Sequence, residues 1–193
     1  MFLFDLLFGK KKSPSAPAPA SPAPHAANAA NAANATPSSP SSPAAASAPG
    51  TAIHHDPALI AGLKRDHELL LEIFGAIGQA SKAGDLAGVQ KRLEHFRIAL
   101  QDHLLKENVR LYVYLEHLLR EDPTSHQLMH GFRHEMDDIG RAVVAFLGKY
   151  KGIAAHPELA ASFATDLEGV GQALVGRIRR EEDTLYPMYE PPA

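Results

Sequence analysis

Apolar side chains recur at steps of three and four through residues 56–190, in four successive segments that turn residues separate. This spacing places the apolar residues of each segment on one face of a helix, and no alternating pattern predicts strands. Residues that end or begin helices mark the boundaries: Asp56-Pro57, Lys82-Ala83-Gly84, Asp122-Pro123 and His156-Pro157. Four amphipathic helices joined by short loops predict an all-α, antiparallel, up-down four-helix bundle.

The chain divides into three parts of different composition. Residues 52–193 hold nearly all the periodic apolar residues and are predicted to form the bundle. Residues 13–51 are rich in alanine, proline and serine and contain no Asp, Glu, Lys or Arg, which predicts a disordered linker. Residues 1–12, MFLFDLLFGKKK, have their lysines after the apolar stretch, unlike an export signal. We interpret them either as a segment that docks peripherally on a membrane or a protein, or as one with no distinct role.

Composition excludes several functional classes. The absence of cysteine rules out disulfides, thiolate zinc sites, iron–sulfur ligation and cysteine nucleophiles. A net charge of −3 with mixed signs gives no reason to expect a nucleic-acid partner. The longest apolar run is much shorter than the roughly 20 residues of a membrane-spanning helix, and we expect a cytoplasmic protein. Eleven histidines, a large number for 193 residues, direct attention to metal binding.

Polar residues interrupt the inward faces of three of the predicted helices. His67 lies in the first helix, His103 and Glu107 lie in the second, and Glu181 lies in the fourth. An inward glutamate is costly unless it forms an ion pair, takes up a proton or binds a cation. Because residues four apart share a helix face, His103 and Glu107 could reach one ion between the helices. The set favours a metal site, with a metal-free polar network as the alternative.

Three segments resemble the hemerythrin-like, or HHE cation-binding, family: Asp66-His67, DHLLKEN (102–108) and REEDTLYP (180–187). The resemblance covers residues 56–190. In that family, histidines and carboxylates from the four helices hold two non-haem irons inside the bundle. For this chain the resemblance implies one or two non-haem irons, and it implies the ligands His67, His103, Glu107 and Glu181.

The fourth helix departs from the family pattern at Arg177, where the family has a histidine. An arginine cannot ligate a metal, and its permanent positive charge opposes a second cation nearby. We expect its guanidinium to lie along Glu181 or Glu107, and the site to hold fewer irons or to hold a pair unevenly.

The third helix offers His130 and His134 as counterparts of the family's histidine, and we take His134 as the fifth predicted metal ligand. Its position lies about 160° from the centre of the apolar stripe at 100° per residue, however. A solvent-facing His134 is therefore the alternative, with Glu135 as a substitute ligand closer to the stripe.

The resemblance implies a sensor or carrier of O2 or NO, or a protein of iron handling. The sequence contains no nucleophile–base pair that argues for an enzyme. The alternative is a metal-free interaction module tethered by its N-terminal tail, because VGQALVGRIRREED (170–183) is similar to the last helix of the anti-sigma regulators of sigma D. In that interpretation Arg177 pairs with a glutamate across the core.

Residues 1–51 should be dispensable for folding, since the linker has no apolar periodicity that could pack on the bundle. A protein that starts at Ala52 is expected to melt within a few degrees of the full-length chain in a calorimetric scan. A large loss of thermal stability on truncation would show that the tail packs on the bundle.

Overall fold

The computed structural model describes residues 53–191, so the predicted segment 1–12 and the linker 13–51 lie outside the described residues. Within this range the chain is helical and contains no strand. The α-helices are α2 (Leu59–Lys82), α3 (Leu86–Lys106), α4 (Val113–Leu118), α5 (Pro123–Tyr150) and α6 (Ala160–Arg180). A π-helical turn, Glu107–Tyr112, joins α3 to α4, and a second one, Glu181–Leu185, extends α6. None of the described helices is both long and apolar enough to cross a bilayer.

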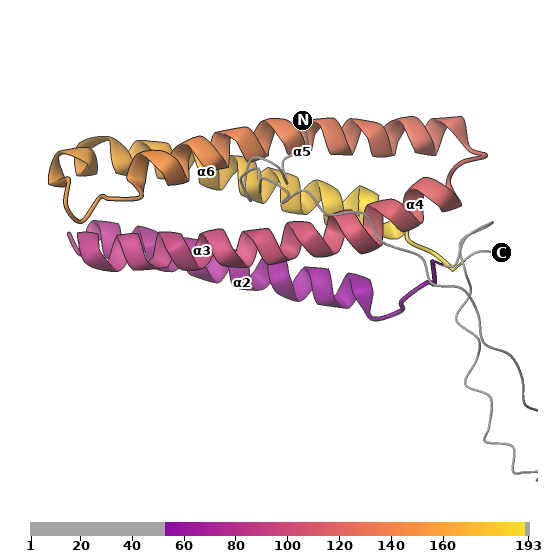
Figure 1. Cartoon of the computed structure of the whole chain (residues 1–193), viewed down its shortest axis with the longest axis horizontal. Coiled ribbons are helices and arrows are strands. Elements are labelled where there is room, and N and C mark those ends of the chain that lie inside the picture. The colour runs from indigo at the N-terminus through magenta and orange to yellow at the C-terminus, as the bar shows by residue number, and fades with distance from the viewer. Residues whose placement is uncertain (1–52, 192–193) are drawn as a thin grey trace, which may run out of the picture.

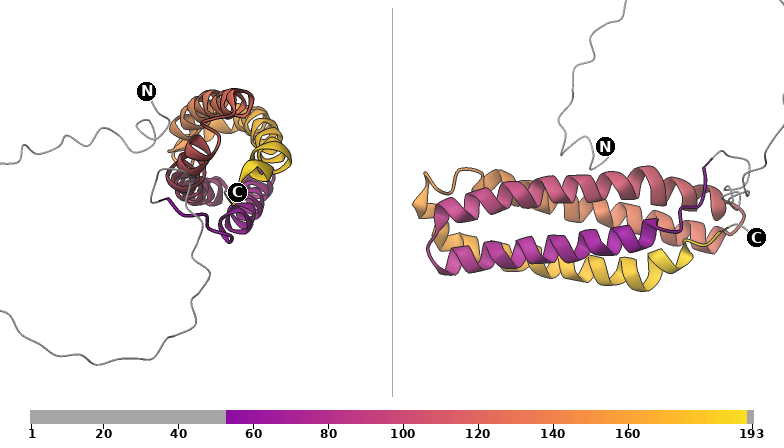
Figure 2. Two further views of the ribbon diagram at one scale, coloured as in Figure 1. Left: turned by 90° about the vertical axis from the view of Figure 1, so that its right-hand side faces the viewer. Right: turned by 90° about the horizontal axis from the view of Figure 1, so that it is seen from below.

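The four long helices lie side by side and surround a common core (Figure 1), and the end-on view in Figure 2 shows them arranged around one axis. Helix α2 packs on α3 and on α6, and α5 packs on α6. Successive long helices run in opposite directions, which confirms the predicted up-down bundle. Both ends of the described range meet at one end of it, where the His55 ring stacks on Tyr189 at 4.7 Å and the backbone N–H of Asp56 donates to the Tyr189 hydroxyl.

The turn between α2 and α3 is fixed by backbone hydrogen bonds. Gly84 has a φ of 69°, and the N–H groups of Gly84 and Asp85 donate to the carbonyls of Ser81 and Ala80. These two bonds form the motif that commonly ends a helix at a glycine. The Asp85 side chain then accepts from the N–H of Gly88 at 2.8 Å and caps α3.

Two helix starts differ from the sequence-based expectation. The sequence places the first helix start at Asp56-Pro57, but the Asp56 side chain accepts from the N–H of Ala58 in a preceding turn, and α2 begins at Leu59. Pro157 opens a short 3-10 turn before α6 begins at Ala160. The start of α5 is as expected, because the Asp122 side chain accepts from the N–H of Thr124 at 3.0 Å.

The buried side chains form two apolar clusters along the bundle. One cluster lies towards the α2–α3 turn and includes Leu70, Phe96 and Phe163. The other lies towards the chain ends and includes Leu63, Leu111 and Leu185. Six polar or charged residues are buried, and all but Gln101 lie where the two clusters meet along the helices: His67, His103, Glu107, Arg177 and Glu181. We call these five residues the polar layer.

Two glycine substitutions, one in the turn after α2 and one within α2, should change the free energy of unfolding in opposite directions. Gly84→Ala should lower the free energy of unfolding by about 1–2 kcal/mol, because a side chain disfavours positive φ. Gly75 is an exposed residue in the interior of α2, and a methyl group added there would meet no neighbouring atom within 4 Å. Gly75→Ala should therefore raise the free energy by about 0.5–1 kcal/mol. Denaturant titration of both variants measures the two shifts, and a stabilising Gly84→Ala would contradict this account of the turn.

Candidate metal centre

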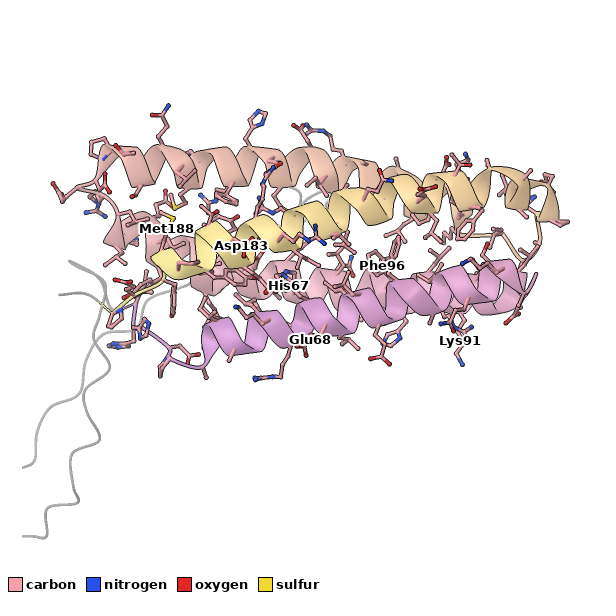
Figure 3. All side chains as sticks on the ribbon, turned by 180° about the vertical axis from the view of Figure 1, so that it is seen from behind. His67, Glu68, Lys91, Phe96, Asp183 and Met188 are labelled. Atoms are coloured by element: carbon pink, nitrogen blue, oxygen red, sulfur yellow. The ribbon has the colours of Figure 1, made fainter. Side chains whose placement is uncertain are left out.

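The polar layer brings four predicted ligands, each from a different helical segment, into the core. His67 comes from α2, His103 from α3, Glu107 from the start of the first π-turn and Glu181 from the start of the second. None of them is more than 3% exposed. His67 lies between α2 and α6, in the interior of the bundle (Figure 3). His67, His103 and Glu181 each offer one ligand atom, and these atoms lie within 4.8 Å of one another.

Each ring nitrogen of His67 and of His103 faces a carboxylate oxygen. On the inner side, His67 Nε2 lies 3.3 Å from Glu181 Oε2, and His103 Nε2 lies 3.8 Å from Glu107 Oε2. On the outer side, His67 Nδ1 lies 2.8 Å from Glu182 Oε1, and His103 Nδ1 lies 3.8 Å from Asp66 Oδ2. A carboxylate on the outer nitrogen is the usual partner of a metal-binding histidine, since it fixes the tautomer that leaves the other nitrogen free to ligate.

Asp66 is suited to this outer role. The neighbouring His103 and the Lys106 ammonium, 2.7 Å from Asp66 Oδ2, lower the pKa of Asp66 to about 2, against the opposing effect of its partial burial. It therefore stays an anion over the physiological range. When His67 donates its Nδ1 hydrogen to Glu182, His67 Nε2 and Glu181 Oε2 face each other as two acceptors, and a cation or a proton must lie between them.

Two buried tyrosines that the sequence pattern did not indicate form hydrogen bonds with residues of the polar layer. The Tyr186 hydroxyl donates to Glu107 Oε1 at 3.1 Å and lies 3.2 Å from His67 Nε2. The Tyr112 hydroxyl accepts from Arg177 Nη2 at 2.7 Å. Each tyrosine follows a buried glutamate by five residues, in ENVRLY (107–112) and in EEDTLY (181–186).

The π-turns explain why these tyrosines face the site. Five residues in an α-helix turn the side chain by about 140° from its starting direction, so Tyr112 would point away from the face of Glu107. A π-turn closes its hydrogen bonds five residues apart and brings the two positions nearer to one face. The recurring pattern of a glutamate followed five residues later by a tyrosine was the available signal.

Arg177 lies inside the layer and is 3% exposed. Its Nε donates to Glu181 Oε1 at 2.6 Å, which agrees with the expected pairing. Burial alone would raise the pKa of Glu181, but the His67 hydrogen bond and the Arg177 charge outweigh it and the pKa is lowered. Glu181 is therefore an ionised carboxylate with partners on both sides.

Glu107 has fewer partners. Burial and then the charge of Glu181 raise the pKa of Glu107 to about 8. In the described part of the chain, Glu107 Oε2 and His103 Nδ1 are the buried side-chain polar atoms with no hydrogen-bond partner. Unsatisfied buried acceptors are rare in native proteins and often mark a bound ion or a functional role.

His134 does not join this cluster, and its prediction as a ligand from α5 is wrong for this structure. Its side chain is 82% exposed and lies 3.8 Å from Asp138, because its position is on the solvent side of the α5 apolar stripe. His130 is exposed as well, with its ring 4.6 Å from that of His126. Glu135 is closer to the core, but it pairs with Arg177 and Arg180.

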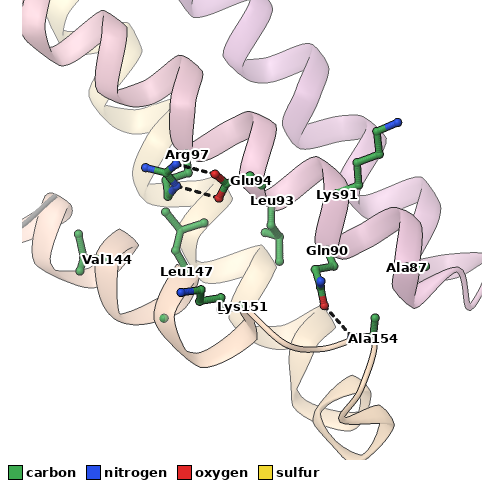
Figure 4. A pocket seen from close by; sticks show the side chains of 11 residues that line it. Ala87, Gln90, Lys91, Leu93, Glu94, Arg97, Val144, Leu147, Lys151 and Ala154 are labelled. Atoms are coloured by element: carbon green, nitrogen blue, oxygen red, sulfur yellow. Dashed lines mark hydrogen bonds and ion pairs between the residues drawn. The ribbon is translucent and has the colours of Figure 1, made fainter. Parts of the chain in front are cut away.

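A groove of about 810 Å³ lies between α3 and α5, towards the α2–α3 turn (Figure 4). Its lining has no histidine and one carboxylate, Glu94, which is paired with Arg97. Gln90 accepts there from the backbone N–H of Ala154 at 3.2 Å. The groove therefore lacks the donors of a metal site, and the polar layer is the stronger candidate.

Comparison with known families gives one result. A family model, the hemerythrin HHE cation binding domain, matches residues 58–189, well over half of the chain. No curated protein and no solved structure matches the chain. The matched range contains the whole polar layer.

The state of Glu107 predicts how stability depends on pH in chelator-treated protein. The pKa of Glu107 is about 8 in the folded state and 4.5 as its ordinary value, so the folded protein keeps a proton that the unfolded chain releases. The free energy of unfolding should therefore fall as pH rises from about 4.5 to 8, by about 1.4 kcal/mol for each unit of pKa difference.

Glu107→Gln should remove this dependence and be more stable than the wild type at pH 8, with the difference shrinking towards pH 5. Glu68 is exposed on α2, so Glu68→Gln serves as the matched control and should keep the wild-type dependence. Denaturant titrations across this pH range measure it, and parallel curves for wild type and Glu107→Gln would contradict the assignment.

Proposed function

Because the chain belongs to the family of hemerythrin HHE cation-binding domains, we propose that it binds non-haem iron in the polar layer and thereby senses or carries O2 or NO, or serves iron handling. The observation that carries the proposal is the convergence of His67, His103 and Glu181, with ligand atoms within 4.8 Å of one another in the bundle core. Glu107 is the fourth donor, since its Oε2 faces His103.

The types of donor favour iron. Two histidines and one carboxylate with open coordination positions are the ligand set of non-haem ferrous proteins. The chain has no cysteine, so the thiolates that select softer metals are missing. Glu107 Oε2, which is buried without a hydrogen-bond partner, also favours a site that is completed by a ligand other than protein.

The protein groups around the donors hold them in place. Glu182 and Asp66 orient the two imidazoles, and the Tyr186 hydroxyl fixes one oxygen of Glu107. The two apolar clusters close the layer on either side along the bundle axis and exclude water from it. The chain thus supplies orientation and a dry surrounding.

When bound, a ferrous ion with an unfilled coordination position supplies a binding place for a diatomic molecule. An apolar cavity of about 20 Å³ lies next to Arg177, and none of the four proposed ligands lines it. It is lined by Leu100, Leu104, Met136, Ile139, Gly140, Val143, Leu174 and Arg177. A cavity of this size admits one small molecule, and its apolar lining favours O2 or NO over water.

The metal-free interaction module stays the second hypothesis, and the Arg177–Glu181 ion pair is the observation in its favour. That pair neutralises one of the two buried glutamates and leaves Glu107 without a cation. Docking through residues 1–12 belongs to either hypothesis as a proposal.

His103→Ala should lower the ferrous affinity by more than about 100-fold, since losing an outer partner of a ligand already costs 10–100-fold. The measurement is iron per chain after anaerobic loading and desalting, together with the near-ultraviolet ligand-to-metal absorption in air. His134→Ala is the matched control and should keep the wild-type iron content, because His134 faces solvent. Equal iron in the wild type and His103→Ala would contradict the proposed site.

A further inference from the structure

The two oxygens of the Glu181 carboxylate face different partners. Its Oε2 lies 3.3 Å from His67 Nε2, on the side of the histidine cluster. Its Oε1 accepts from Arg177 Nε at 2.6 Å, on the side of α5. A carboxylate with one oxygen on each side can bridge two cations, and in this protein a guanidinium already holds one of the two places.

The same guanidinium also binds three further oxygen atoms around it. Arg177 Nη2 donates to the Tyr112 hydroxyl at 2.7 Å, and Nη1 donates to the Phe132 carbonyl at 3.1 Å and to Glu135 Oε2 at 3.3 Å. Arg180 also pairs with Glu135. A second metal ion on this side would have to take its ligands from Arg177.

Arg177 cannot give up this place by losing a proton or by turning outward. A guanidinium stays protonated in proteins, and this one is buried with its carbon 5.0 Å from the centre of the Phe132 ring. Its charge lies one carboxylate away from the histidine cluster and repels a further cation at short range.

On the other side of Glu181, which faces the histidines, the oxygen atoms are not all bound. Among the described residues, Glu107 Oε2 is buried without a hydrogen-bond partner, and it faces His103 Nε2 at 3.8 Å. A free carboxylate oxygen is therefore present on the side of His67 and His103.

We propose that the Arg177 guanidinium takes the place of a second metal ion, so that the centre binds one ion per chain, with Glu181 bridging that ion and the guanidinium. This inference rests on the proposed function, because it requires metal binding in the polar layer. The side chain at position 177 then determines how many metal ions the centre binds.

The test is a titration of full-length, chelator-treated protein with cobalt(II), followed through its visible absorption bands. We expect the wild type to saturate at one equivalent per chain. Saturation at two equivalents would overturn the inference and leave the proposed function intact, whereas no binding at the layer would refute the proposed function itself.

Arg177→His replaces the guanidinium by an imidazole, which can bind a metal ion together with the neighbouring Glu181, Glu135 and Tyr112. The end point of the titration should therefore rise to two equivalents per chain. Arg180→His is the matched control: Arg180 also pairs with Glu135 but is half exposed, so its end point should stay at one. A folded Arg177→His that saturates at one equivalent would overturn the role given to Arg177.

If Arg177→His does not fold, paramagnetic resonance of the cobalt-loaded wild type decides the question. An isolated high-spin ion should integrate to one spin centre per chain. A coupled pair would give a weakened signal at two ions per chain and would contradict the inference.

Discussion

The burial of the two carboxyl groups of Glu107 and Glu181 is the constraint to which the rest of the core is adapted. An ionised carboxylate inside a protein costs several kcal/mol unless cations and hydrogen bonds compensate it. Arg177 compensates Glu181, and the Tyr186 hydroxyl binds one oxygen of Glu107. The histidines face the remaining oxygens, and the two apolar clusters on either side keep water out. The proposed metal ion at the histidines would compensate Glu107, as Arg177 compensates Glu181.

Much of the site could be predicted from the sequence because its residues break a regular pattern. Three- and four-residue steps of apolar side chains define the inward faces, and His67, His103, Glu107 and Glu181 occupy inward positions where an apolar residue would stand. The structure brings all four together. His134 shows the limit of resemblance: its angle of about 160° from the α5 stripe indicated solvent, and the structure agrees with the angle rather than with the family pattern.

The two π-turns could not be derived from the same pattern. A period of 3.6 residues places Tyr112 and Tyr186 away from the glutamates that precede them by five residues. Their inward positions depend on a local change of hydrogen-bond register, which a helical period does not contain. Both turns begin at a buried glutamate of the polar layer, so the irregular backbone and the candidate chemistry coincide.

The most direct test of the account is the location of the metal in crystals of the iron-loaded protein, by anomalous diffraction at the iron absorption edge. The account predicts one peak per chain, bounded by His67, His103, Glu107 and Glu181, with the Arg177 guanidinium still on the far oxygen of Glu181. A peak at another place, or no peak in protein shown to be loaded under the same conditions, would contradict the metal site. Two peaks within the bundle would contradict the role of Arg177 as the second cation.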